Sequence, residues 1–402
     1  MVLQEFYFEL IFASAQILFI LNLNKMKKKY ILGALAFSLF AVSCKKDGCT
    51  DPIAINYNDE ADNDDGFCEY SAGEAAPTDY VFTDADGNNT VSYTGQTERL
   101  AQLAEMVVLM KTGTSQPVDV QKLDDMFANV GDNGNGNFSF SSTKQLENKC
   151  FAADVDIFKN AFDSVAVASL SNGVTAQNGV AGTLTTTDGA STYLFNSNGI
   201  EYLQIAEKGL MGAVFMHQAL NVYFGDGKMD VDNTTPEDPA NGKYYTEMEH
   251  HFDEAFGYFG VDPTFPEVIP SSFWGKYSNS QGMNDLIMND FIRGRFAITQ
   301  NNLTERDAAI NALRQNWEIL SAMQAIDYLN GAVSSFGSDQ SRFLHVVAEA
   351  YAFVLNLRYA PVETRQLSQA QVNDILAMFG DNFWNLTLSD INAIKSALEA
   401  TF

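Results

Sequence analysis

The spacing of apolar residues along the chain predicts helices over most of its length. Apolar side chains recur every three or four residues, which is the period of a helix with one buried face. The segments with this pattern are 96–111, 118–130, 154–170, 199–224, 243–260, 283–299, 304–331 and 341–358. Two short segments, 183–187 and 192–195, are strand candidates. We therefore expect an all-α fold, and the length of residues 80–402 predicts two packed helical-bundle lobes.

Segment 199–224 is apolar over most of its circumference, unlike the other predicted helices. Such a helix is buried on all sides, so we expect it at the centre of the fold. Gly209 and Gly212 lie within it. Both glycines are predicted to let a neighbouring helix approach closely.

The N-terminal region has the pattern of an export signal that follows an over-extended start. Residues 1–25 are apolar and end before a second methionine, Met26. Residues 26–43 then carry three consecutive lysines, an apolar run and a small residue before Cys44. This resembles the lipobox of bacterial lipoproteins, which implies that Cys44 is lipidated and anchors the chain in the outer membrane, on its periplasmic or surface face. Two apolar transmembrane helices and an ordinary secreted protein remain the alternatives.

The four cysteines indicate a small closed module in residues 44–79. Cys49 and Cys68 bracket an acidic stretch, which leaves Cys150 alone. A Cys49–Cys68 disulfide would close that loop and stabilise it by roughly 3 kcal/mol. The stretch resembles a cysteine-bracketed module of exported bacterial proteins, with CTDP, NYN and DDGxC motifs. Its acidic side chains are either calcium ligands or a solvated spacer: Asp59, Asp62, Asp64 and Asp65.

The net charge narrows the class of partner. The chain carries a formal charge of −27, and residues 1–43 hold four lysines and two glutamates, so their removal gives −29. A nucleic-acid or anionic-lipid surface is disfavoured, whereas cations and basic ligands are favoured. Simple surface hydration is the other explanation of this charge.

Two predicted helices each place a histidine beside carboxylates at the margin of a buried face. His251 has Glu247 and Glu254 at spacings of four and three, and His345 has Glu349 at a spacing of four. If the two margins face each other, they offer enough ligands for a transition metal. The same groups could instead be buried polar pairs that set helix register. His250 is predicted to point to the solvated side of its helix.

Several segments together resemble a known family. They are HFDE at 251–254, the helix at 345–359, GLMGAVF at 209–215 and VSYTGQTERL at 91–100. They resemble the imelysin-like lipoproteins of Gram-negative bacteria, in a branch known as a domain of unknown function, over residues 80–402. The resemblance implies an all-helical fold of two bundle-like halves and a role in the uptake of iron or another ligand. His251 and Glu254 match the last part of the family signature GxHxxE, whereas Glu249 stands at its glycine.

Three functional classes follow from these patterns. The first is an envelope lipoprotein that binds a cation, a metal complex or a peptide for an uptake partner. The second is a metal-dependent, peptidase-like hydrolase, and the third is a structural surface protein. The chain has no HExxH motif and no Ser/His/Asp or Cys/His arrangement at a recognisable spacing. The binding class is therefore favoured, with a transition metal or calcium as the expected cofactor.

Overall fold

The computed structural model describes residues 46–50, 54, 56–58, 60–64, 68 and 75–402. The chain divides into two compact units, Met1–Ala75 and Ala76–Phe402. In the first unit, β1 (Asp47–Gly48) pairs in parallel with β2 (Asn63–Asp64). The predicted Cys49–Cys68 disulfide is confirmed, and Cys150 is a buried free cysteine. The predicted signal peptide and Cys44 lie outside the described residues.

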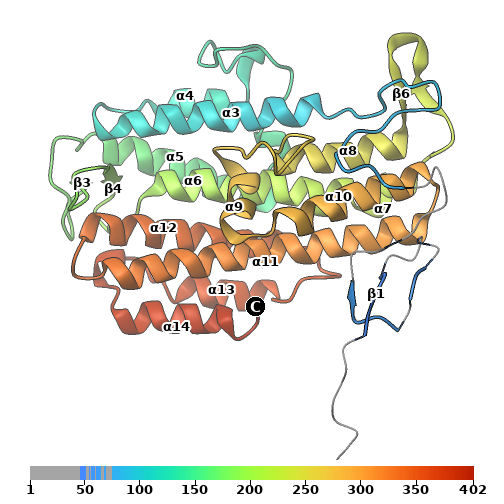
Figure 1. The fold of residues 1–402 in the computed structure, drawn as a ribbon. Coiled ribbons are helices and arrows are strands. Elements are labelled where there is room, and N and C mark those ends of the chain that lie inside the picture. Colours follow the sequence, from blue (N-terminus) through green and yellow to red (C-terminus); the bar gives the residue numbers. More distant parts are fainter. Residues whose placement is uncertain (1–45, 51–53, 55, 59, 65–67, 69–74) are drawn as a thin grey trace, which may run out of the picture. The chain divides into compact units, whose positions relative to one another are not determined.

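Helices dominate the second unit, which confirms the all-α class (Figure 1). The α-helices are α3 (Thr94–Lys111), α4 (Val120–Phe127), α5 (Val155–Ser169), α6 (Tyr202–Leu210), α7 (Asp226–Met229), α8 (Glu247–Phe259), α9 (Phe273–Gln281), α10 (Asn284–Thr299), α11 (Leu303–Ser335), α12 (Gln340–Asn356), α13 (Gln369–Ala377) and α14 (Leu388–Glu399). Two antiparallel hairpins join β3 (Gly182–Thr185) to β4 (Thr192–Phe195), and β5 (Pro236–Asp238) to β6 (Lys243–Thr246). The chain length led us to expect two lobes, and the structure holds all these helices in one compact unit.

Short helical turns complete the second unit. The 3-10 turns are η1 (Thr112–Thr114), η2 (Val130–Asp132), η3 (Glu147–Lys149), η4 (Ala152–Asp154), η7 (Pro239–Asn241), η8 (Leu357–Tyr359) and η9 (Phe383–Asn385). The segment after α6 continues as the π-helical turns η5 (Met211–Met216) and η6 (Gln218–Tyr223). None of the helices in the described ranges is both long enough and apolar enough to cross a membrane.

The core forms where the longest helices meet. Helix α11 packs along both α10 and α12, and α12 packs against α6 (Figure 1). Trp274 of α9 and Trp317 of α11 are fully buried in this core, with their rings edge to face. The apolar faces predicted from the sequence are buried, including Met248, Phe252 and Phe259 on α8.

The central segment is as buried as its composition predicted, and its two glycines allow close contacts. A side chain at Gly209 would lie 2.6 Å from the ring of Phe158 on α5, and one at Gly212 would collide with Asn356 on α12. The amide of Asn356 in turn donates to the carbonyl of Lys208 at 3.0 Å. The predicted close helix contacts are therefore confirmed.

Helix α8 is shorter than predicted at its start. Residues 243–246 form strand β6, and the helix begins at Glu247 because Thr246 caps it. The Thr246 hydroxyl accepts from the backbone N–H of Glu249 at 3.2 Å, and the Glu249 carboxylate accepts from the N–H of Thr246 at 2.9 Å. This reciprocal capping box satisfies two helix-end donors and fixes the boundary.

Helix α11 is likewise displaced from its prediction. Its cap is Asn302, whose side chain accepts from the N–H of Glu305, and Thr304, the first residue of the predicted segment, lies inside the helix. The helix also continues past Gly331 to Ser335, because α12 packs along it and buries Ala332 and Ser335.

A fully buried arginine ties α10 to α8. Arg295 donates to Asp253 at 2.9 Å and to Glu249 at 2.8 Å, and also to the backbone carbonyl of Thr90. Burial raises the pKa of Asp253 to about 6, and Arg295 opposes that rise, so the carboxylate is ionised at neutral pH. The pair fixes the orientation of α8 in the core.

Candidate functional site

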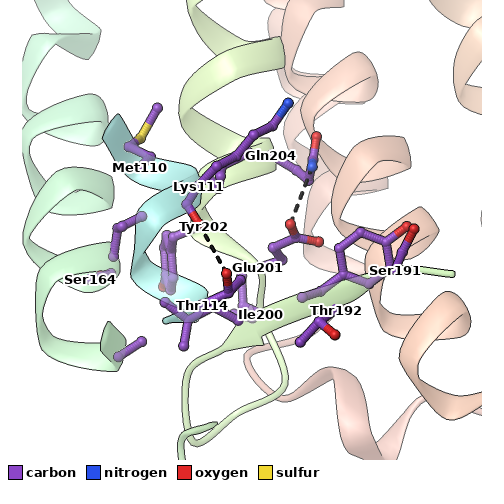
Figure 2. Close-up of a pocket in the computed structure, with 15 residues that line it drawn as sticks. Met110, Lys111, Thr114, Ser164, Ser191, Thr192, Ile200, Glu201, Tyr202 and Gln204 are labelled. Atoms are coloured by element: carbon purple, nitrogen blue, oxygen red, sulfur yellow. Dashed lines mark hydrogen bonds between the residues drawn. The ribbon is translucent and has the colours of Figure 1, made fainter. Parts of the chain in front are cut away.

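A cavity of about 350 Å³ lies between the end of α3, the C-terminal part of α5, strand β4 and the start of α6 (Figure 2). Its lining mixes apolar and polar side chains, namely Met110, Lys111, Thr114, Ser164, Val165, Ala168, Ser191, Thr192, Tyr193, Leu194, Ile200, Glu201, Tyr202, Leu203 and Gln204. A second, more open hollow of about 460 Å³ is lined by nine described residues, from Tyr80 to Thr97 and Pro263, none of them charged. The first cavity therefore holds more of the groups that bind ligands.

Glu201 is the buried charged group of the cavity wall. It occupies the N-cap position of α6, where its side chain makes no cap hydrogen bond, and it is only 3% exposed. Its Oε1 accepts from Gln204 Nε2 at 3.2 Å, and its Oε2 lies 2.6 Å from His345 Nδ1 (Figure 2 shows the Gln204 contact). The positive end of the helix dipole also favours a carboxylate at this place. The Oε1 of Gln204 is buried and has no hydrogen-bond partner among the described residues.

His345 connects Glu201 to a second buried carboxylate. Its Nε2 lies 3.3 Å from Glu349, one turn along α12, and its ring stacks on Tyr193 with centroids 3.9 Å apart. Burial alone would lower the pKa of His345, but Glu201 and Glu349 together hold that pKa above its ordinary value. Both ring nitrogens face carboxylates, an arrangement that favours the protonated ring.

The polar network continues away from the cavity through Lys208. Its Nζ lies 2.7 Å from Glu207 and 3.9 Å from Glu349, and it lies over the ring of Tyr277. Burial raises the pKa of Glu349, whereas His345 and Lys208 oppose the rise. Three acidic side chains (Glu201, Glu207 and Glu349) thus meet two basic ones, so acidic groups outnumber basic groups in the network.

His251, the other candidate histidine, has a different environment. Its ring is 5% exposed, and Nδ1 donates to the backbone carbonyl of Lys228 at 2.9 Å. Its Nε2 lies 3.0 Å from Lys228 Nζ, so it accepts from the ammonium group. Burial, with help from the Lys228 charge, lowers the pKa of His251. The ring is therefore neutral, and both nitrogens have partners.

The carboxylates predicted beside His251 do not bond to it. Glu254 accepts from Gln96 at 2.8 Å and from the Tyr223 hydroxyl at 3.1 Å, whereas Glu247 is exposed. His250, expected on the solvated side, is half-buried because strand β6 covers it. Its ring stacks on Tyr245, and its Nδ1 contacts the carbonyl of Ser92 at 3.0 Å.

The structure does not bring His251 and His345 together. His345 contacts Glu201, just before the helical segment 202–223, and His251 contacts Lys228, just after it. A helix of that length spans roughly 30 Å, so one ion cannot touch both rings. In the part of the chain that the structure describes, no cluster of three or more His, Cys, Asp or Glu side chains has the geometry to hold a metal ion.

The predicted calcium ligands are only partly described. Asp62 and Asp64 are exposed, and one oxygen of Asp62 accepts from the backbone N–H of Lys46 at 3.3 Å. Asp59 and Asp65 lie outside the described residues. Calcium binding by this module stays a prediction.

Comparison with protein-family models places the second unit in a family. Residues 77–402 match the model of a domain of unknown function, DUF4856. No curated protein and no solved structure matches the chain. Because the family model covers most of the sequence, the chain belongs to the DUF4856 family.

Proposed function

We propose that this protein is a binding lipoprotein of the cell envelope and that its ligand site is the cavity walled by Glu201. The observation that carries the proposal is a buried carboxylate in the wall of a cavity of about 350 Å³. That volume lies at the lower end of the range for small-molecule sites. Buried polar groups in such a wall cost stability unless they are bonded, so a ligand that supplies donors gains affinity there.

The envelope location rests on the sequence. The residues before Cys44 resemble a lipobox, and the segments at 91–100, 209–215, 251–254 and 345–359 resemble imelysin-like lipoproteins. The resemblance adds an uptake role, in which the protein passes its ligand to a partner protein. The cysteine-bracketed unit would act as a compact spacer, and its aspartates offer oxygen ligands to calcium.

A metal-dependent hydrolase is the less favoured candidate. A catalytic metal needs three protein ligands and an open position. His345 is held between two carboxylates, and the lone pair of His251 is used by Lys228. Because one ion cannot touch both rings, metal binding by His251, Glu254 and Glu247 and by His345 and Glu349 would need two separate sites, and each ring would have to exchange its partners. Both sets stay predictions.

A thermal-unfolding screen tests the cavity. The mature chain is heated with a library of small amines, amino acids, short peptides, organic acids and metal salts, since a ligand that binds the folded state raises the melting temperature. We expect at least one compound to stabilise the wild type. Ser164→Phe, which narrows the cavity from α5, should abolish that stabilisation.

The matched control is Val167→Phe, which adds the same ring to an exposed position of α5 outside the cavity. It should respond to the same compound as the wild type does. Stabilisation that persists in Ser164→Phe would place the site elsewhere and contradict the proposal.

A further inference from the structure

We infer that the cavity takes a small zwitterion of the aliphatic amino-acid type, with its ammonium group on Glu201 and its carboxylate at Lys111. This inference rests on the proposed function and names the class of ligand. It comes from the two charges of opposite sign in one lining and from the apolar surface between them.

The ammonium end is assigned to Glu201. A carboxylate offers about four acceptor positions, and Glu201 has two partners, Gln204 and His345. The unpartnered Oε1 of Gln204, whose side chain is 95% buried, is a second acceptor in the same lining. An ammonium group has three donors and no acceptor, which matches these oxygens.

The surrounding charge also favours a cation at this place. The network of Glu201, Glu207, Glu349, Lys208 and His345 places three acidic side chains against two basic ones. A bare metal ion is less suited than an organic ammonium, because both ring nitrogens of His345 already have carboxylate partners. The ammonium group needs only acceptors, which the wall provides.

The carboxylate end is assigned to Lys111. This lysine is exposed at the end of α3, and its side chain extends toward α6 (Figure 2). The Lys111 charge also helps to lower the pKa of Glu207, but Glu207 already pairs with Lys208 at 2.7 Å. The Lys111 ammonium is therefore available to a ligand at the rim of the cavity.

The remaining lining accounts for the aliphatic part of the ligand. Apolar side chains come from four elements and the loop before α6: Met110, Val165, Ala168, Leu194, Ile200 and Leu203. Apolar surface that leaves water on binding is the main source of affinity for such a group. A branched side chain of the size of leucine is the simplest probe of this surface.

The first experiment is calorimetric titration of the mature chain with three matched probes. Leucine carries both charges, isoamylamine lacks the carboxylate, and isocaproate lacks the ammonium group. We expect leucine to bind most tightly, and each probe with one charge to bind about 10- to 100-fold more weakly, since each lost partner is a charge-assisted hydrogen bond.

Four variants then assign the two ends. Lys111→Gln should weaken the binding of leucine by about tenfold or more and leave the binding of isoamylamine unchanged. Lys122→Gln removes an exposed lysine outside the cavity and is its control. Glu201→Gln should weaken the binding of both leucine and isoamylamine. Its control is Glu349→Gln, which disturbs the same histidine but does not line the cavity, and it should weaken binding less.

The outcomes separate this inference from the proposed function. Equal binding of leucine and isoamylamine, or no effect of Lys111→Gln, overturns the zwitterion assignment. If isocaproate or a neutral compound binds the wild type and Ser164→Phe abolishes that binding, the ligand class is wrong. The proposed function, with the cavity as the binding site, then still stands. If no compound binds in a manner sensitive to Ser164→Phe, both the inference and the proposed function fail.

Discussion

His345 and His251 show how the surroundings decide the charge of the same side chain. Two carboxylates flank His345 and stabilise its protonated form, whereas an ammonium group and a carbonyl flank His251 and require a neutral ring. Both rings are largely buried, so neither charge state is set by water. The first ring contacts the cavity wall through Glu201, and the second holds α7 against α8.

Replacing His345 should give a pH-dependent loss of stability. The folded-state pKa of His345 is raised, so its contribution is complete below the unfolded pKa of about 6.5 and is lost as the pH rises through the folded pKa. His345→Gln should therefore lower the free energy of unfolding by about 1–3 kcal/mol at pH 6 and by less at higher pH. Urea unfolding of both proteins across this pH range measures the difference. A loss that grows with pH would contradict the imidazolium.

Replacing His251 should cost stability without changing metal affinity. His251→Gln removes the two part-buried hydrogen bonds between the His251 ring and Lys228, so we expect the free energy of unfolding to fall by about 1–3 kcal/mol. Calorimetric titration with iron, zinc and copper ions should give the same result for wild type and variant. A metal affinity of the wild type that this variant abolishes would restore the metal assignment of His251.

At the scale of single elements, periodicity predicted the helices and their buried faces but not their ends. The stripe of α8 is buried as expected, yet its first four predicted residues pair with β5, which is a contact between segments that periodicity does not report. Three charged residues, Glu201, Glu207 and Lys208, lie inside an otherwise apolar segment. Charged side chains in such a segment need partners when they are buried, so this pattern could have indicated the buried network. Their partners on α12, His345 and Glu349, required the tertiary fold.

The contact between the central segment and α12 leads to a test at the same scale. Gly212→Ala would force the new methyl group against Asn356, whose amide is fixed on the Lys208 carbonyl. We expect a loss of about 1–3 kcal/mol from this overpacking. Gly227→Ala, in α7, meets open space and should change stability by less than about 0.5 kcal/mol. Chemical unfolding compares the two, and equal stabilities would refute the close contact.

At the scale of the whole molecule, the sequence predicted the all-α class and the disulfide, since both follow from local patterns. The cavity could not be predicted, because its walls come from residues between Met110 and Gln204 that are far apart along the chain. The sequence also could not show whether the two histidine margins face each other. A helical wheel shows that a side chain lies at a margin, but not which other helix it meets.

The attachment of the molecule to the membrane has its own test. Cys44→Ala should release the protein from the membrane fraction, because the acyl chains would have no cysteine to join. Cys150→Ala, a change at the buried free cysteine, should leave it there. Cell fractionation followed by a mass measurement of the protein tests this prediction. A Cys44→Ala protein that stays membrane-bound with residues 1–43 attached would exclude the lipid anchor.

The most direct test of the central claim, that the Glu201 cavity is the binding site, is an NMR titration of the histidine ring signals. The chain has four histidines, so each ring can be followed separately in protein without a histidine tag. The titrant is leucine, or else the compound that gives the largest thermal stabilisation. We predict that the His345 signals shift with saturation, whereas those of His217, His250 and His251 stay in place. Saturable shifts of His251 with an unchanged His345 would contradict it.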